Sequence, residues 1–471
     1  MVFSSPTFLF AFLPLTLLGL ALVRRRGFQN AWLLGMSALF YIWGAGAAVL
    51  VLAGVTAVSF AAGFLPWRGL RERSSRAPFR LTLAGCIAVL LVPLVFFKYL
   101  PVVAPAGPLA QLALPIGISF FTFHAISYVV DVARGTIVRE SNARDYALYL
   151  FVFPHQIAGP IVRFAEIRDE LAGFRDAGVR QVGYGITRFT WGLAKKALVA
   201  DPVGILADSL FPLSTQGLLS GTDAWAAALL YALQIYFDFS AYSDMAIGLA
   251  LILGFHFPEN FLQPYRSISV TDFWRRWHMT LTRWFRDYVY IPMGGNRHGP
   301  VRATVALLTV FALTALWHGA AITFLIWGAM HSAALLFERV TGLRRTERFA
   351  VLRRILVLVF VVVSWVPFRA ASRDELSGMW SAMFAPASWV PGPVLLTGIT
   401  PFVVLAVLVG LVSLFGPRRT TGFVAVFGAS TSRDLDGMRW RVAIPVTVLL
   451  FAASIAAILW TGFSPFLYYQ F

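Results

Sequence analysis

Residues 303–337, ATVALLTVFALTALWHGAAITFLIWGAMHSAALLF, contain no Asp, Glu, Lys or Arg. A membrane-spanning helix needs about 20 mostly apolar residues, so this stretch is long enough to enter a bilayer. Its titratable residues are His318 and His331. On a helix that starts at Arg302, His318 lies about 24 Å along the axis, which is less than the thickness of the hydrocarbon layer. We therefore expect His318 inside the membrane, where an ionisable residue is costly and marks a candidate functional site.

Apolar stretches recur along the whole chain of 471 residues. Hydrophobic residues make up 58% of the sequence and charged residues only 13%, against roughly 25% in soluble domains, which excludes a soluble enzyme. We predict membrane-embedded segments at Pro6–Val23, Ala31–Gly44, Ala47–Pro66, Leu81–Phe97, Leu112–Val130, Tyr146–Val162, Phe189–Ala200, Trp225–Leu253, Ala303–Trp317, Ile322–Phe337, Ile355–Phe368, Thr397–Leu414 and Val442–Trp460. The sequence thus predicts an all-α, polytopic integral membrane protein, with residues 1–471 as a single domain. We expect about eleven to thirteen membrane-embedded helices, plus interfacial amphipathic helices, around a central cavity.

Basic residues dominate the charge of the chain. There are 39 Lys and Arg against 22 Asp and Glu, a net charge of +17. In a soluble protein this balance would suggest nucleic acid, but here the basic residues lie in short loops, where membrane topology and anionic lipid explain them. We expect membrane lipid and no nucleic acid as partner. The single cysteine, Cys86, excludes an internal disulfide and a cysteine metal cluster, and we expect no metal site.

The segment Thr271–Tyr290, TDFWRRWHMTLTRWFRDYVY, is the most informative polar stretch. Plotted as one helix, its aromatic residues share one face and its arginines the other, so we predict an amphipathic helix in the membrane plane. His278 lies at the edge of the aromatic face. Two interpretations of the arginines remain open. Arg275, Arg276, Arg283 and Arg286 either anchor the helix at the membrane interface or contact an anionic cofactor, for example through the phosphates of coenzyme A.

His318 also has two interpretations. Histidine has a pKa suited to proton transfer near neutral pH, Gly319 allows close approach of a ligand, and Trp317 could form a wall of the pocket. Alternatively, His318 is a neutral core histidine that is hydrogen-bonded to a neighbouring helix.

Further polar residues interrupt other apolar stretches. Gln234, Asp238 and Tyr242 share one helical face, and Asp238 and Asp244 need partners inside hydrocarbon. These residues either line a functional cavity or mark a helix break with structural caps. His155 and His331 are further candidates for lining the cavity.

Six ordered motifs over nearly the whole chain resemble those of the membrane-bound O-acyltransferases, in their alginate O-acetyltransferase-like branch. The motifs are Phe153–Pro160 (FPHQIAGP), Tyr236–Asp244 (YFDFSAYSD), Pro258–Phe261 (PENF), Asp272–Leu281 (DFWRRWHMTL), Tyr290–Asn296 (YIPMGGN) and Leu316–Gly319 (LWHG), together with the N-terminal Met1–Ser5.

The resemblance implies that His318 is the catalytic residue and that His278 is its companion. It implies transfer of an acyl group, usually acetyl, from a cytoplasmic thioester across the bacterial cytoplasmic membrane toward hydroxyls of an extracytoplasmic polysaccharide. The acceptor is reached directly or through a periplasmic acetyltransferase partner. Acetyl-CoA or a similar acyl-CoA is then the donor substrate, with no tightly bound cofactor, and Arg275, Arg276, Arg283 and Trp317 are candidates for binding it.

A transporter or flippase is the alternative from another functional class. His318, Asp238 and Asp244 could form an ion relay, as intramembrane ionisable residues often do. Against this alternative, the sequence shows no internal repeat of the kind that many transporters carry.

Overall fold

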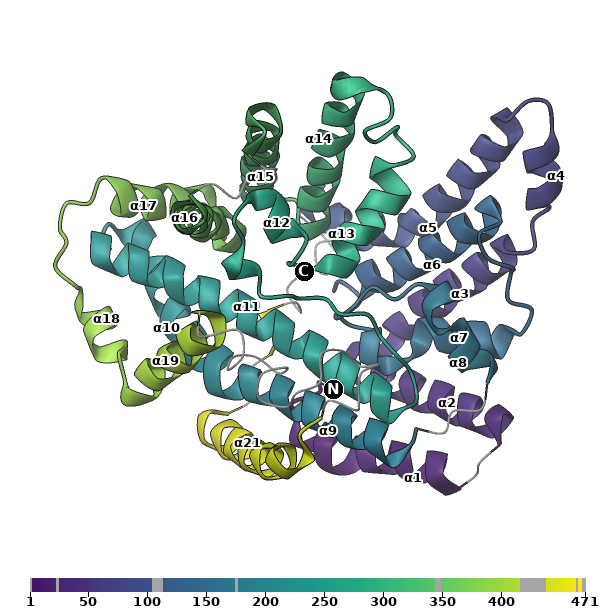
Figure 1. Ribbon diagram of the computed structural model, residues 1–471, viewed down its shortest axis with the longest axis horizontal. Helices are drawn as coiled ribbons and strands as arrows, with labels where there is room; N and C mark the ends of the chain where they lie inside the picture. The colour runs from purple at the N-terminus through teal and green to yellow at the C-terminus, as the bar shows by residue number, and fades with distance from the viewer. Residues whose placement is uncertain are drawn as a thin grey trace. The chain divides into compact units, whose positions relative to one another are not determined.

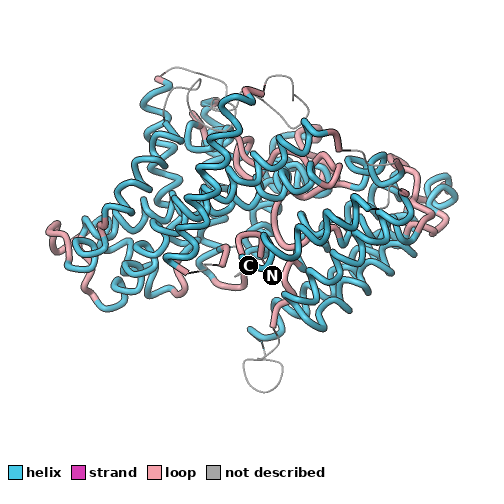
Figure 2. The backbone as a smooth tube through the Cα atoms, turned by 90° about the horizontal axis from the view of Figure 1, so that it is seen from below, coloured by secondary structure: helices cyan, strands magenta, loops and turns pink. Residues whose placement is uncertain are grey.

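The computed structural model describes residues 2–22, 25–103, 113–173, 177–343, 349–415, 438–462 and 465–467. Within these ranges every regular element is a helix (Figures 1 and 2). Seven helical stretches are long and apolar enough to cross a membrane, namely Arg26–Ala62, Ala77–Val103, Val179–Gln216, Gly221–Ile252, Gly299–His318, Ala350–Arg369 and Trp440–Thr461. Two shorter apolar stretches are Phe8–Leu22 and Pro401–Phe415. The all-α membrane fold is confirmed, with several of the expected segments too short to cross alone.

The chain divides into two compact units. Unit 1 comprises residues 1–186 and 245–258, and unit 2 comprises residues 187–244 and 259–471. The division falls within α9, Val179–Ala194, and α11, Gly221–Ile252. The remaining helices of unit 1 are α1 (Leu13–Leu22), α2 (Arg26–Ala45), α3 (Val49–Ala62), α4 (Trp67–Glu72), α5 (Ala77–Val103), α6 (Ile118–Arg134), α7 (Ala143–Phe151) and α8 (Phe164–Ala172). That residues 1–471 form a single membrane domain stays a prediction.

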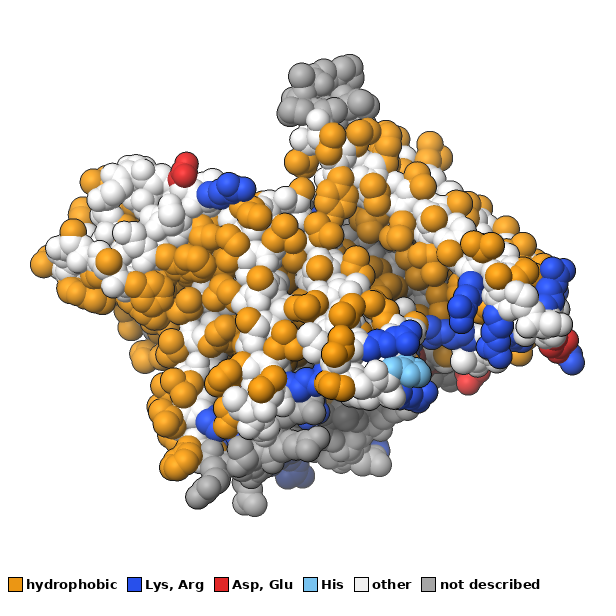
Figure 3. Space-filling model, turned by 90° about the horizontal axis from the view of Figure 1, so that it is seen from above, with side chains coloured by type: hydrophobic (Ala, Val, Ile, Leu, Met, Phe, Trp, Pro, Cys, Tyr) orange, Lys and Arg blue, Asp and Glu red, His pale blue; other side chains and the backbone are white. Residues whose placement is uncertain are grey.

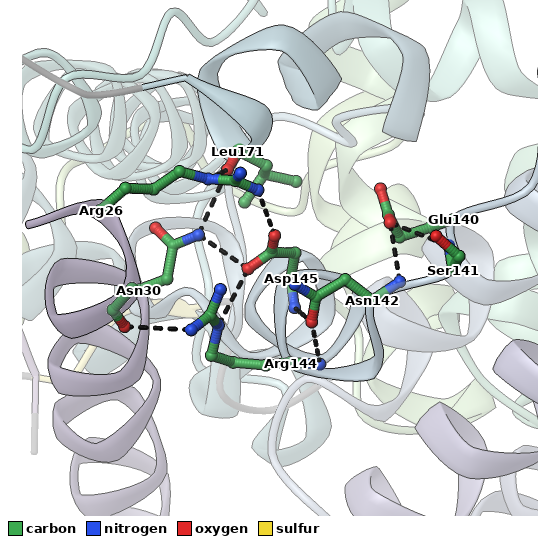
Figure 4. A network of polar contacts seen from close by, with 9 residues as sticks. Arg26, Asn30, Glu140, Ser141, Asn142, Arg144, Asp145 and Leu171 are labelled. Atoms are coloured by element: carbon green, nitrogen blue, oxygen red, sulfur yellow. Dashed lines mark hydrogen bonds and ion pairs between the residues drawn. The ribbon is translucent and has the colours of Figure 1, made fainter.

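A buried carboxylate joins three helices of unit 1 (Figure 4). Asp145 of α7 is ion-paired with Arg26 at the start of α2, and it accepts a hydrogen bond from Asn30 Nδ2 at 2.8 Å. Arg26 and Asn30 also donate to the carbonyl of Leu171 in α8. Asn142 caps α7, because its side chain accepts from the backbone amides of residues 144 and 145. A buried charge is tolerated when it is paired and hydrogen-bonded in this way.

The predicted segment Tyr146–Val162 is not one helix. The helix α7 ends at Phe151, and a short 3-10 turn, Phe153–His155, leads into a buried loop. Pro154 lacks an amide hydrogen, and Gly159 adopts a positive φ of 108°, which disfavours a continued α-helix. The prediction of one membrane-embedded helix over this segment was therefore wrong, because the backbone turns after Phe151.

Unit 2 holds the remaining helices. They are α10 (Asp201–Leu210), α12 (Val270–Trp274), α13 (Met279–Phe285), α14 (Gly299–His318), α15 (Ile322–Thr341), α16 (Ala350–Arg369), α17 (Arg373–Phe384), α18 (Pro393–Gly398), α19 (Pro401–Phe415) and α21 (Trp440–Thr461). The helix α11 is buried from Leu230 to Ile252, whereas α14 exposes Leu308, Leu313 and Leu316. Hydrophobic side chains cover much of the face shown in Figure 3. Exposed apolar surface of this extent suits contact with lipid rather than water.

The predicted amphipathic helix Thr271–Tyr290 is interrupted once, between Trp274 and Met279. Helix α12 ends at Trp274, α13 begins at Met279, and a π-helical turn, Arg286–Tyr290, follows α13. His278 lies at this break and adopts the left-handed backbone conformation, with φ 44° and ψ 54°. Backbone hydrogen bonds to the preceding segment flank this break, from the amide of Met279 to the carbonyl of Asn260 and from the amide of Leu262 to the carbonyl of Arg276, both at 2.9 Å. The prediction of one continuous helix was wrong because it considered no partner outside the segment.

Candidate functional site

His318 is the last residue of α14 and is enclosed by aromatic rings. Its imidazole lies 4.4 Å from the ring of Trp317, 4.7 Å from Phe368 and 5.3 Å from Trp327, measured between ring centroids. The residue is 6% exposed. The break after α14 places Gly319 where a Cβ atom would lie 2.5 Å from the ring of Phe324. A side chain at residue 319 would therefore displace one of the rings that surround His318.

His278 reaches the same indole from a different part of unit 2. Its ring is 1% exposed, lies edge-on to Phe239 at 4.7 Å, and is 6.3 Å from the ring of Trp317. The left-handed backbone at residue 278 turns the imidazole into the core. The structure thus brings His278, Trp317 and His318 together, although the first two are 39 positions apart in the sequence.

Asn260, from the motif Pro258–Phe261, holds His278 in one orientation. Its side-chain oxygen lies 3.1 Å from His278 Nδ1 and accepts from the amide and the hydroxyl of Thr280, while its Nδ2 donates to Ser243. A backbone amide can only donate, so this oxygen is fixed as an acceptor. His278 Nδ1 must then carry the hydrogen, which leaves the lone pair on Nε2.

Burial keeps His278 uncharged. The surrounding protein excludes water from the imidazole, and this lowers the pKa of His278 from 6.5 to about 3. At neutral pH, His278 is therefore a neutral ring whose Nε2 can accept a proton or a hydrogen bond.

The carboxylates predicted as cavity-lining residues are both ion-paired in unit 2. Asp244 lies 2.6 Å from Arg188 Nη2 and 2.6 Å from Lys195 Nζ, and Arg188 also contacts Glu259 at 2.8 Å. Asp238 lies 2.8 Å from Lys196 Nζ. Sequence analysis missed these three basic partners. The signal was present, because a pair of lysines inside the apolar stretch Phe189–Ala200 is as unusual as an aspartate inside α11.

Residues near the C-terminus complete the environment of Asp238. The backbone amide of Leu467 donates to Asp238 Oδ2 at 2.9 Å, and Lys196 Nζ donates to the carbonyl of Pro465 at 3.0 Å. Phe466 is buried, and its ring lies 5.2 Å from that of Tyr242. Asp238 and Tyr242 therefore contact the chain's own residues 465–467. The helix α11 continues through both positions, so the alternative of a helix break was wrong.

A pocket of about 230 Å³ lies beside α12 and α13. Three arginines line it, Arg275, Arg283 and Arg286, together with Glu259. Arg276 is not among the lining residues, because its Nε donates to Asp272 at 2.8 Å. Arg275 and Arg283, two of the three arginines predicted to bind the donor, thus line one small pocket.

The other predicted histidines lie elsewhere. His331 bridges α12 and α16, with Trp274 Nε1 at 3.2 Å from Nδ1 and Ser364 Oγ at 3.1 Å from Nε2. The ring of Trp327 contacts both His331 and His318, with centroids at 5.2 and 5.3 Å. His155 belongs to unit 1, where its ring lies 4.4 Å from that of His124 and its Nε2 is 2.8 Å from the carbonyl of Tyr149.

Comparison with known proteins agrees with the fold and with the motifs. The family model of the membrane-bound O-acyltransferases matches residues 33–372. Probable alginate O-acetylase AlgI of Pseudomonas aeruginosa is 38% identical, with 100% of both chains covered. Peptidoglycan O-acetyltransferase of Helicobacter pylori is 33% identical, covering 80% of this chain and 78% of its own, and teichoic acid D-alanyltransferase of Bacillus subtilis is 25% identical, covering 62% and 74%. This chain therefore belongs to the membrane-bound O-acyltransferase family and is an integral membrane acyltransferase.

Proposed function

We propose that the protein moves an acetyl group from a cytoplasmic thioester, acetyl-CoA, toward hydroxyls of an extracytoplasmic polysaccharide, directly or through a periplasmic acetyltransferase partner. The membrane is then the bacterial cytoplasmic membrane. The observation that carries the proposal is the placement of two buried imidazoles, His278 and His318, against the single indole of Trp317. The names of the relatives, an alginate O-acetylase and a peptidoglycan O-acetyltransferase, support acetyl as the group and a carbohydrate as the acceptor.

The chemistry needs a base for the attacking hydroxyl. In the proposed step, neutral His318 takes the hydroxyl proton while the oxygen attacks the thioester carbonyl. A carbon–oxygen bond forms, the carbon–sulfur bond breaks, and the departing thiolate takes the proton back from His318. His278, held by Asn260 with its lone pair on Nε2, orients or assists this transfer. Aromatic walls limit water around the reacting groups, which strengthens every electrostatic interaction there.

The pocket lined by Arg275, Arg283 and Arg286 supports a role in holding the donor. Arginine binds phosphate through paired N–H groups, and coenzyme A carries phosphates far from its thioester. A volume of about 230 Å³ suits part of such a donor rather than the whole molecule. Arg276, ion-paired with Asp272, is better explained as a structural residue.

The ion pairs of Asp238 and Asp244 argue against the alternative function, a transporter or flippase. It required Asp238 and Asp244 to carry ions, whereas both carboxylates are neutralised by lysine or arginine in unit 2. Membership of an acyltransferase family points in the same direction.

The test is a thiol-release assay on purified protein in lipid nanodiscs. Wild-type protein with acetyl-CoA and a soluble acceptor or partner should release free coenzyme A and acetylate the acceptor. His318→Gln should lower the rate by about 10²- to 10⁴-fold, the usual contribution of a general base. His298→Ala is the matched control, because His298 is exposed in a loop. A wild-type rate in His318→Gln would remove His318 from the mechanism.

A further inference from the structure

An apolar groove of about 430 Å³ lies on unit 2, apart from the two histidines. Helices α10, α11, α16, α18 and α19 line it, with Leu233, Val362, Val403 and Val407 among the lining side chains. Its volume falls within the roughly 300–1,000 Å³ typical of small-molecule sites. An acetyl group has two carbons and needs no groove of this size, so the proposed substrate does not explain it.

One end of the groove carries positive charge. A neighbouring cavity of about 280 Å³ shares Tyr265, Leu358 and Phe415 with the groove, and it adds Arg266 and Arg354. No acidic residue is among those that line either cavity in the described part of the chain. Arg266 is held in place, because its Nε donates to the carbonyl of Leu414, and Arg354 is exposed near the start of α16.

This combination matches one class of ligand. An apolar groove accommodates an acyl chain, and two arginines at its end complement a phosphate, which arginine can bind through two parallel hydrogen bonds. Basic pockets between membrane helices bind anionic lipid headgroups for the same reasons. A zwitterionic phospholipid would fill the groove equally well but would gain less from the two positive charges.

We propose that unit 2 binds one anionic phospholipid of the surrounding membrane, with an acyl chain in the groove and the phosphate between Arg266 and Arg354. The site is separate from the histidines and from the arginine pocket beside α13. It adds to the transferase function and does not depend on it.

Native mass spectrometry tests this proposal on the full chain, released from nanodiscs that contain equal amounts of phosphatidylglycerol and phosphatidylcholine. Wild-type protein should retain one phosphatidylglycerol in preference to phosphatidylcholine. Arg354→Ala and Arg266→Gln should each lower that retention by about fivefold, the usual effect of one basic residue near an anionic lipid. Val407→Trp should reduce retention of both lipids by filling the groove.

Arg441→Ala is the control, because Arg441 is also an exposed arginine at the start of a spanning helix, α21. It should retain phosphatidylglycerol as wild type does. Equal retention of the two lipids by wild type would overturn the proposal, and so would unchanged phosphatidylglycerol retention in Arg354→Ala, whose exposed position leaves the fold unaffected.

Discussion

Replacing Asn260 should separate the orientation of His278 from its charge. The Asn260 side-chain oxygen lies 3.1 Å from His278 Nδ1, 3.3 Å from the amide nitrogen of Thr280 and 2.9 Å from the hydroxyl of Thr280. Asn260→Ala removes this acceptor from three buried donors. Asn260→Asp keeps the acceptor and adds a negative charge next to the imidazole.

The expected magnitudes follow from these contacts. A buried donor left without a partner costs about 1–3 kcal/mol. The hydroxyl of Thr280 can turn to another acceptor, which leaves two donors, so Asn260→Ala should lower stability by about 2–6 kcal/mol. Loss of the group that orients a functional histidine should lower kcat by about 10- to 100-fold. In Asn260→Asp, a carboxylate beside Nδ1 favours the charged ring and should raise the pKa of His278 from about 3 by about 1–3 units.

The sign of the pH effect can be worked out. A raised pKa means that His278 becomes protonated at higher pH than in wild type, and a protonated Nε2 accepts nothing. Asn260→Asp should therefore match wild type near neutral pH and lose activity as the pH falls through about 4–6, where the His278 of wild type is still neutral.

The assay is thiol release from acetyl-CoA across pH, with kcat and KM determined separately. Circular dichroism and thermal unfolding in detergent would show that each variant is folded. A folded Asn260→Ala with wild-type kcat would refute the positioning role of Asn260. An Asn260→Asp profile that overlays wild type would refute the requirement for an unprotonated Nε2 on His278.

Three further predictions concern other parts of unit 2. Lys196→Met leaves Asp238 and Asp201 without their shared cation and should cost about 3–5 kcal/mol, measured by thermal unfolding; a loss no larger than that of Arg68→Ala, in an exposed ion pair, would contradict it. Arg283→Ala should raise the KM for acetyl-CoA by about tenfold, with exposed Arg297→Ala as the control, and an unchanged KM would return Arg283 to a structural role. Gly319→Ala should displace Phe324 and lower kcat by up to about 100-fold with little change in KM, and wild-type kcat would show that the packing around His318 tolerates the shift.

The sequence predicted the positions of most helices, because the length of an apolar stretch can be read from neighbouring residues alone. The segment Trp225–Leu253 appears as α11, and Ala303–Trp317 as α14, each within a few residues. Tyr146–Val162 failed, because an apolar stretch that is buried in protein has the same composition as one that faces lipid. Hydropathy alone cannot distinguish the two environments.

The candidate site was predictable in its residues but not in its arrangement. His278 and His318 could be named from their motifs. Their shared contact with Trp317, however, accompanies a helix break at His278 whose hydrogen-bond partners lie outside the segment. The ion pairs of Asp238 and Asp244 were equally hidden, since their partners lie more than 40 positions away in the sequence. Long-range pairing of this kind leaves no periodic signal.

Ion pairs join α11 to the segment formed by α9 and its π-helical continuation, Lys195–Ala200. These ion pairs also constrain how the protein is inserted into the membrane. During synthesis, the first segment emerges before α11 and carries Arg188, Lys195 and Lys196. Each unpaired charge at the centre of a bilayer costs about 2.5–3.5 kcal/mol on insertion scales. Asp201, in the same segment, can pair with Lys196, but Arg188 and Lys195 gain their partner Asp244 only when α11 arrives. Lateral release of the first segment alone would thus be unfavourable, so the two segments should leave the translocon as a pair.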